Sequence, residues 1–412
     1  MMKQHKIPFN DSMYYENQKG WMISHSSLCE LNFLTKKASI IKKLEVDFES
    51  NHSPFLSVVK HDKKFYLSPG IEGKYIGIYN QDVDEIHNIQ LREMNNANQV
   101  DCLLKPSLNP GIKVENYIFY SGFSYPAIVV IDTLTDDIFY IDDWILNIEK
   151  SIVNKQEFTH YFSRGYEIID NNIYFGFACL PKLLKIDLSN MTTEIIELET
   201  DVYGISGLTK LDEKRIFITA RGKSGNRCLI WNKDTLEIEN QIEIDEYNSQ
   251  AIDSLYPVVN CNNRFFLFPF ITLFAENIYE IDIKSLSIGI KTNLSMGINK
   301  YDASETEFMQ HVLVLQEDQG IIRYLSGSDL HWYEWDEKTD TTINYVIELD
   351  ENEESLIDCW SDCALDFVWN GQTVPERLIP LKGFIDLVVK DKNEDLEDKE
   401  KIGDKICKLF VR

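Results

Sequence analysis

The amino-acid sequence predicts an all-β protein in which one four-stranded antiparallel unit is repeated along the chain. The clearest copy spans residues 162–199. Four short apolar stretches within it, 166–169, 173–177, 183–186 and 193–198, have the length of strands, and turn-forming residues separate them. A sheet that is apolar on both faces needs neighbours to cover it, and further copies of the same unit can do so.

A column of equivalent residues indicates seven copies. At the end of each expected third strand, an apolar or aromatic residue is followed by Asp or Asn, and these positions recur every 45 to 55 residues. Five of the seven are followed by Thr or Ser three positions later, which is typical of a tight turn between antiparallel strands. The seven positions are Asn32, Asn80, Asp132, Asp187, Asn232, Asp282 and Asp336.

A second column lies in the expected second strands, where two apolar residues stand side by side. Strands that are apolar at consecutive positions are buried on both faces, as in the middle of stacked sheets. The pairs are Trp21-Met22, Phe65-Tyr66, Ile118-Phe119, Ile173-Tyr174, Ile216-Phe217, Phe265-Phe266 and Ile321-Ile322.

The two columns divide residues 11–349 into seven copies, at 11–45, 54–91, 105–148, 162–199, 205–244, 255–294 and 309–349. Four-stranded sheets at this period are typical of radial packing, so the sequence predicts a seven-bladed β-propeller. The alternative is an open row of sheets, which would need capping elements and would leave strand edges exposed.

Several copies resemble the blades of known propellers. The ends CLIWNKDT (228–235) and WYEWDEKT (332–339) resemble the third strand of WD40-like blades. VVIDTLT (129–135) and LLKIDLS (183–189) are similar to blades of YVTN-type and streptogramin-lyase-type propellers. The Gly-His dipeptide of WD repeats and the double glycines of kelch repeats are absent. The resemblance therefore implies the propeller superfamily and no specific family, and it assigns no site residue.

The C-terminal part departs from the repeat. Residues 350–364 are acidic, and the patterns at 381–389 and 396–410 predict two helices, so 350–412 is expected to be an acidic linker with a small helical appendage. These helices either pack on the outside of the propeller or serve as a docking handle for a partner protein.

The composition restricts the class of partner. A formal net charge of −26 disfavours nucleic acid and anionic membranes, and it favours a basic protein or peptide, a cation or a neutral ligand. No apolar run is long enough for membrane insertion, and no secretory signal is recognisable, so we expect a cytoplasmic protein.

Cysteine usage is consistent with that location. Eight cysteines are scattered, mostly in apolar strands, which is typical of buried thiols in a reducing compartment. Cys359 and Cys363 have no nearby Cys or His to complete a tetrahedral zinc site, so neither a metal nor another cofactor is predicted.

Candidate binding residues follow from propeller geometry. First strands line the central channel, and the loops that join blades ring one channel mouth together with the loops between second and third strands. Ionisable side chains at such a mouth can hold an anion or a metal, or act as acid and base; equally, they can be the polar rim of a solvated surface. The candidates are His52, His160, Arg164, Arg221, Asp253, Lys300, Tyr301 and His311.

A partner surface is expected at two apolar segments. The loop around Phe270 and Phe274 follows Pro269 and is rich in apolar side chains, whereas the earlier aromatics of the same copy are expected in the core. The last predicted helix carries Ile402, Ile406 and Phe410 on one stripe.

Two functions from different classes remain. The first is a non-catalytic binding scaffold that recruits a peptide or protein partner through the channel-mouth loops, and it is favoured because the sequence contains no recognisable catalytic constellation. The alternative is a hydrolase or lyase with a metal-based or His/carboxylate-based site at the channel mouth, acting on a small or sugar-like substrate.

Overall fold

The structure is a computed structural model that describes residues 12–24, 27–44, 55–69, 74–93, 107–152, 160–222, 225–244, 258–268, 277–293, 312–316, 320–326, 332–349, 368–369 and 372–373. The chain divides into two compact units. The first contains residues 1–298 and 309–349, and the second contains residues 299–308 and 350–412. In the second unit the structure describes one antiparallel pair, β30 (Val368–Trp369) and β31 (Gln372–Thr373). The helices expected at 381–389 and 396–410 lie outside the described residues.

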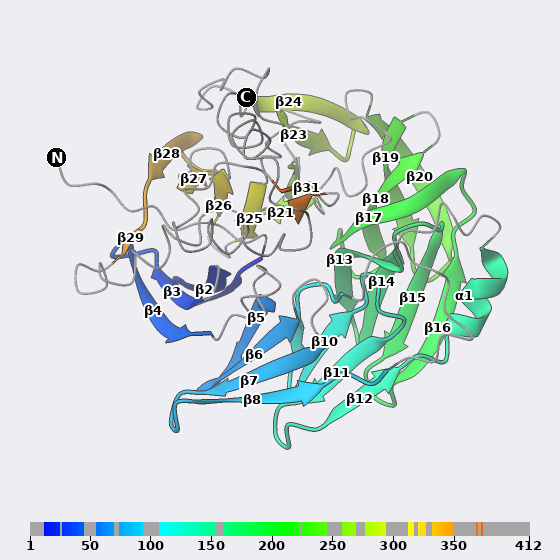
Figure 1. Ribbon diagram of the computed structural model, residues 1–412. Coiled ribbons are helices and arrows are strands. Elements are labelled where there is room, and N and C mark those ends of the chain that lie inside the picture. Colours follow the sequence, from blue (N-terminus) through cyan, green and yellow to red (C-terminus); the bar gives the residue numbers. More distant parts are fainter. Residues whose placement is uncertain are drawn as a thin grey trace, which may run out of the picture. The chain divides into compact units, whose positions relative to one another are not determined.

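The first unit contains seven four-stranded antiparallel sheets arranged around a central axis (Figure 1), which confirms the all-β, seven-bladed β-propeller. We number the sheets 1 to 7 in chain order. Sheets 1 to 3 consist of β1 (Tyr14–Glu16), β2 (Lys19–Ser24), β3 (Ser27–Asn32) and β4 (Lys37–Lys43); β5 (Phe55–His61), β6 (Lys64–Pro69), β7 (Tyr75–Asn80) and β8 (Glu85–Gln90); and β9 (Ile112–Val114), β10 (Tyr117–Ser121), β11 (Ile128–Asp132) and β12 (Ile138–Ile141).

Sheets 4 to 7 follow the same order. They consist of β13 (Phe162–Ile169), β14 (Asn172–Phe177), β15 (Lys182–Asp187) and β16 (Thr192–Glu197); β17 (Val202–Lys210), β18 (Arg215–Gly222), β19 (Gly225–Asn232) and β20 (Glu237–Ile244); β21 (Val259–Cys261), β22 (Arg264–Leu267), β23 (Asn277–Asp282) and β24 (Ser287–Asn293); and β25 (Val312–Gln316), β26 (Ile321–Ser326), β27 (Trp332–Asp336) and β28 (Thr341–Tyr345).

The Asp/Asn column occupies the same corner of all seven sheets. In each sheet the Asp or Asn ends the third strand, and its side-chain oxygen accepts a hydrogen bond of 2.8–3.0 Å from the backbone N–H two residues later. The residue four positions after it has a left-handed backbone conformation, with φ between 53° and 63°. The spacing in the sequence therefore indicates one turn geometry that all seven sheets share, in which the side chain caps the turn's own amides. The seven left-handed residues are Lys36, Asp84, Asp136, Met191, Leu236, Leu286 and Asp340.

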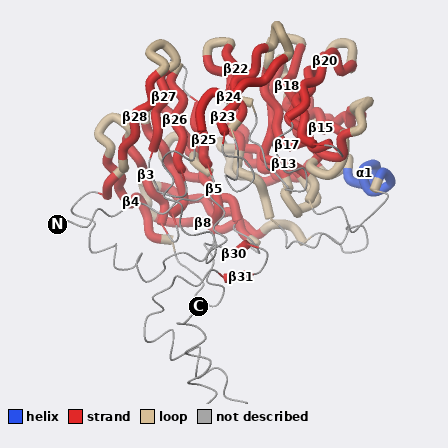
Figure 2. Tube along the Cα trace, turned by 90° about the horizontal axis from the view of Figure 1, so that it is seen from above, coloured by secondary structure: helices blue, strands red, loops and turns tan. Residues whose placement is uncertain are grey.

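One element in this unit was not expected from the sequence. A short helix, α1 (Ile145–Ser151), follows sheet 3 and lies at the outside of the sheets (Figure 2). Trp144, directly before it, is fully buried, donates its indole N–H to the carbonyl of Ile141 at 3.0 Å, and packs on Phe162 at a ring distance of 5.0 Å. The helix thus covers the junction between sheets 3 and 4 with an aromatic side chain.

The ring closes through a contact that no repeat pattern encodes. After the seventh sheet, the chain forms β29 (Glu348–Leu349), which pairs in parallel with the outer strand β4 of the first sheet. Arg323 of β26 also reaches sheet 1, where its guanidinium donates to the Tyr15 hydroxyl at 2.8 Å and to the Gln18 side-chain oxygen at 3.0 Å.

Among the described residues, no helix combines the length and the apolar character that crossing a lipid bilayer requires.

Candidate functional site

Strand direction identifies the channel-mouth end of each sheet. In every sheet the first strand runs into a hairpin with the second, and the third runs into a hairpin with the fourth, so these turns share one end, which we call the turn end. First strands therefore begin, and second strands finish, at the opposite end, which we call the mouth end. In sheets 4 and 5 the mouth end contains the start of β13, the end of β14, the start of β17 and the end of β18.

Three of the predicted binding residues, His160, Arg164 and Arg221, are described, and all three lie at this mouth end. The other five, His52, Asp253, Lys300, Tyr301 and His311, lie outside the described residues, as do the predicted partner-surface residues Phe270, Phe274, Ile402, Ile406 and Phe410.

His160 is packed inside the protein. Its side chain is fully buried, and its ring stacks on Phe123 with a centroid distance of 4.3 Å. The backbone N–H of the next residue, Tyr161, donates to the carbonyl of Phe123 at 2.7 Å. This segment therefore fastens the entry of sheet 4 to the loop between the second and third strands of sheet 3, and the imidazole presents no surface to a ligand.

Arg164 lies in the first strand of sheet 4, between Phe162 and Tyr166, where β13 bulges against β14. Its side chain is half-buried. The neighbouring Gly165 permits a close approach of two inner strands, because a Cβ there would lie 2.4 Å from the Cα of Gly207 in β17. Arg164 is therefore on the channel side of the structure, at a point where inner strands of sheets 4 and 5 are in backbone contact.

Arg221, near the end of β18, is 4% exposed. One terminal nitrogen donates to the backbone carbonyl of Ala178 in sheet 4, and the guanidinium lies 5.2 Å from the centre of the Tyr203 ring. Gly204 faces Arg221 in the strand register, and a Cβ at that position would lie 2.8 Å from the guanidinium. A Cβ there would also lie 1.9 Å from the Ala178 carbonyl oxygen, so the glycine accommodates the contact between that carbonyl and the guanidinium.

A second buried arginine in the same sheet is neutralised. Arg227 of β19 forms ion pairs with Asp201 and with Glu243, the latter at 2.8 Å. Burial acts to lower the pKa of Arg227, but the hydrogen bonds that its guanidinium donates to Glu243 and Asp201 outweigh it and raise that pKa. Its charge is therefore balanced by one carboxylate of sheet 5 and one of the segment that precedes it.

Sequence reasoning missed the polar bonds that fix the mouth end of sheet 3. Asn109 is buried and its amide donates at 3.0–3.1 Å to the Ser121 hydroxyl and to the carbonyls of Phe162 and Ser163. Ser107 and Ser124 form a further buried pair, with 3.1 Å between their hydroxyl oxygens. Single Asn and Ser residues have no recurrent spacing, so the sequence offered no signal for this role.

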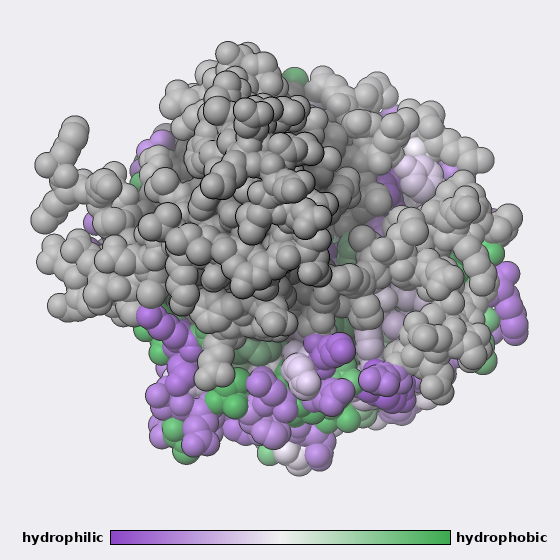
Figure 3. Space-filling view, in the orientation of Figure 1, coloured by the Kyte–Doolittle hydropathy of each residue, from purple (hydrophilic) through white to green (hydrophobic). Residues whose placement is uncertain are grey.

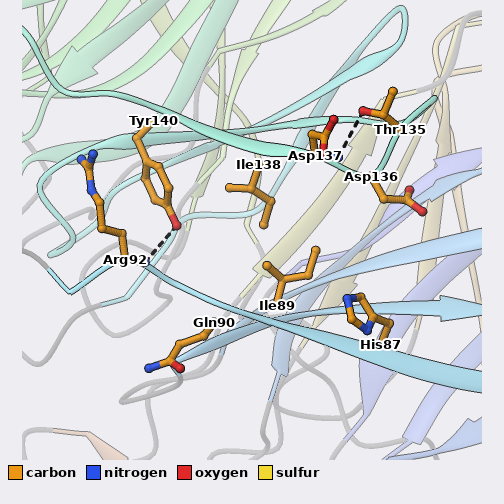
Figure 4. A pocket seen from close by; sticks show the side chains of 9 residues that line it. All are labelled: His87, Ile89, Gln90, Arg92, Thr135, Asp136, Asp137, Ile138 and Tyr140. Carbon is orange, nitrogen blue, oxygen red and sulfur yellow. Dashed lines mark hydrogen bonds between the residues drawn. The ribbon is translucent and has the colours of Figure 1, made fainter.

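An open groove of about 710 Å³ lies between the outer strands of sheets 2 and 3 (Figure 4). Its polar side chains are mostly engaged in the sheet junction. The Tyr140 hydroxyl accepts the Arg92 backbone N–H at 2.9 Å, the Arg92 guanidinium pairs with Asp142, and Asp136 accepts from the Tyr66 hydroxyl at 2.8 Å. The described surface in this part of the molecule is mainly hydrophilic (Figure 3). The groove is thus the wedge that two diverging outer strands leave between them.

The described ranges contain no group of three or more His, Cys, Asp or Glu side chains that is arranged to hold a metal ion.

We compared the chain with known protein families, sequences and structures. No family model matches the sequence. The cytochrome c biogenesis protein Ccs1 of Phaeodactylum tricornutum is 27% identical over 157 residues. That match covers 36% of this chain and 35% of the relative's length, so the chain spans about a third of that protein.

Solved structures resemble the whole propeller. A streptogramin B lyase superposes with a TM-score of 0.50 at 13% identity, covering 79% of this chain and 94% of the lyase. A chain of the mitotic checkpoint complex gives 0.52 at 9% identity, covering 84% and 90%, and KlHsv2 with loop 6CD replaced by a Gly-Ser linker gives 0.50 at 6% identity, covering 82% and 97%. At these identities the likeness concerns the fold alone, and it agrees with the seven sheets: the chain has a β-propeller fold.

Proposed function

We propose that this protein is a non-catalytic binding scaffold that recruits a basic peptide or protein partner at the mouth end of its propeller. The observation that carries the proposal is the fixed placement of the described mouth-end residues. His160 has no exposed surface and stacks on Phe123, and Arg221 is tied to Ala178. Buried side chains held in this way support the mouth end from beneath and keep it rigid, which reduces the entropy lost when a partner binds.

The charge of the chain supports a basic partner. With a net charge of −26, the protein attracts cations over distances of about 10 Å at 0.1 M salt, and complementary charge accelerates association. Glu199, in the segment that joins sheets 4 and 5, places an exposed carboxylate at the mouth end itself.

The experiment is selection of a random peptide library on the full chain, followed by affinity measurement for the enriched peptides. We expect enrichment of Lys and Arg and an affinity that falls between 50 and 500 mM salt, because screening weakens attraction between exposed charges. Enrichment of acidic peptides, or no enrichment, would contradict the proposal.

A matched pair of charge reversals locates the surface. Glu199 and Glu85 are both exposed glutamates, but Glu199 lies at the mouth end and Glu85 follows the turn at the opposite end of sheet 2. Glu199→Arg should weaken binding of the enriched basic peptides several-fold, whereas Glu85→Arg should leave it unchanged. The reverse result would move the binding surface to the turn end, and hydrolysis or elimination of a bound ligand would show an enzyme instead.

A further inference from the structure

Three arginines in the described part of the chain have side chains that are almost completely buried, and their partners differ. Arg227, 8% exposed, pairs with Asp201 and Glu243, and Arg323, 5% exposed, pairs with Glu334 at 2.6 Å. Arg221, 4% exposed, has no carboxylate within ion-pair distance among the described residues. Its contacts there are one backbone carbonyl and one aromatic ring.

Two buried polar atoms at this place, one of Arg221 and one of Thr219, lack a hydrogen-bond partner among the described residues. The Nε of Arg221 is buried without a hydrogen-bond partner, and so is the hydroxyl of Thr219, within the part of the chain that the structure describes. Residues two apart on a strand lie on the same face, so these two groups belong to one side of β18 at its mouth end. Two orphaned buried polar atoms on one strand face, one of them on a charged side chain, indicate a site that receives a polar ligand.

Burying a guanidinium, which has five N–H donors, against a single carbonyl acceptor destabilises the folded protein. Desolvating a charge without a counter-ion is unfavourable, which is why buried arginines are nearly always paired. We propose that Arg221 is the docking point for a single carboxylate group of the peptide or protein partner. This inference rests on the proposed binding function and names the group that the partner contributes.

Charge balance selects a carboxylate over a phosphate. A carboxylate brings one negative charge, which a single arginine neutralises, and its two oxygens fit the donor geometry of a guanidinium. A phosphate brings a charge of about −1.5 to −2, and the excess would be repelled by the acidic chain. The partner is therefore a mainly basic segment that presents one carboxylate, either its C-terminus or an Asp or Glu side chain.

The first test needs no ligand and compares Arg221→Met with Arg227→Met. In the unliganded protein, removing an uncompensated cation should leave the melting temperature unchanged or raise it, because binding sites commonly sacrifice stability. Removing Arg227 breaks two ion pairs and the packing of its buried side chain, so that variant should melt lower than the unmodified protein. Arg221→Met melting as low as Arg227→Met would overturn the inference, since it would show that Arg221 is a structural cation.

The second test uses one pool of Lys- and Arg-rich peptides in three forms: with a free C-terminal carboxylate, with a C-terminal amide, and as the amide with one internal Asp. One of the carboxylate forms should bind the unmodified protein about 10- to 100-fold more tightly than the plain amide, since charge-assisted hydrogen bonds are strong. The form with the higher affinity identifies whether the carboxylate comes from the C-terminus or from a side chain. Arg221→Met should abolish the difference, and Arg221→Lys should retain part of it.

The outcomes separate the two proposals. If all three pools bind equally and with salt dependence, the binding scaffold stands and the carboxylate site is overturned. If no pool binds, the proposed binding scaffold is wrong. The carboxylate site is then tested by itself, by comparing the melting temperature in sodium acetate with that in sodium chloride at equal ionic strength. Acetate should then raise the melting temperature of the unmodified protein and leave Arg221→Met unaffected, and an equal response of both proteins would overturn the inference.

Discussion

Two junctions of the propeller are held together by different chemistry. Between sheets 3 and 4 the packed side chains are aromatic, with Trp144 on Phe162 and Phe177 at ring distances of 5.0 and 5.7 Å, and the neutral amide of Asn109 adds hydrogen bonds to backbone carbonyls. Between sheets 7 and 1 the contact centres on Arg323, which binds Glu334 of its own sheet and the side chains of Tyr15 and Gln18 across the junction.

The closing junction contains an aromatic contact, between Phe33 and Trp332 at a ring distance of 5.0 Å, and further polar and cation–π contacts. The Lys36 ammonium lies 4.3 Å from the centre of the Tyr345 ring, and Lys37 and Glu348 approach to 3.7 Å beside the parallel pairing of β29 with β4. Consecutive sheets meet as the chain continues, and sheets 3 and 4 are held by aromatic packing and neutral hydrogen bonds. The closing junction joins residues about 300 positions apart, and directional groups there specify which edges meet.

The largest effect is expected at the junction between sheets 3 and 4. Trp144→Ala should lower the free energy of unfolding by about 4 kcal/mol, because it leaves a large cavity among fully buried rings. Urea denaturation measures the change. Leu146→Ala in α1 is the control, since Leu146 is 56% exposed and its loss should change stability by less than about 0.5 kcal/mol. Equal effects of the two substitutions would contradict the role assigned to Trp144.

Arg323→Ala at the closing junction should cost about 3 kcal/mol, since it leaves Glu334 largely buried without its cation. The double variant Arg323→Ala/Glu334→Ala should be less destabilised than the sum of the single variants, because the two residues share one interaction. Hydrogen exchange should show faster opening of β1 and β4 than of the strands of sheet 5. Uniform exchange throughout the ring would argue against a separate closing junction.

A third junction differs from both, because a carboxylate contacts the neighbouring sheet with backbone donors. Glu167 of β13 accepts the N–H of Lys210 in β17 at 2.5 Å and the N–H of Ile168 at 2.9 Å. Burial raises the pKa of Glu167, and these two hydrogen bonds only partly oppose the shift.

Stability at this third junction should therefore depend on pH. A carboxyl with a raised folded-state pKa contributes stability that is present below the unfolded pKa of about 4.3 and lost as the pH rises through the folded pKa. The free energy of unfolding of Glu167→Gln should equal that of the unmodified protein near pH 4 and exceed it at pH 7.5. This difference should be smaller than the two effects described above. Glu237→Gln, at an exposed position of β20, should show no such pH dependence. A loss of stability in Glu167→Gln at pH 7.5 would refute the assignment.

The smallest effect is expected for Lys36→Gln, which removes the cation from the Tyr345 ring and should cost about 0.5 kcal/mol. The cost should shrink at high salt, whereas Lys338→Gln, in the exposed turn of sheet 7, should be neutral throughout. Both are measured by thermal unfolding at low and high salt. Identical behaviour of the two variants would remove Lys36 from the closing contacts.

The sequence determined the architecture because its signal is local. An Asp or Asn that caps its own turn needs only its next few residues, so the seven turns from Asn32 to Asp336 were recognisable by spacing alone. The apolar pairs in the second strands report burial on both faces in the same local way.

The tertiary structure alone decided the closing contacts, the packing of Trp144 and the environment of Arg221. Each depends on residues that are distant in sequence and share no period: Arg323 with Tyr15, Trp144 with Phe177, and Arg221 with Ala178. The sequence placed His160 and Arg221 at the mouth end but assigned them the same role. Their contacts separate them, because the His160 ring stacks on Phe123, whereas Arg221 carries a charge that the described residues leave without a carboxylate.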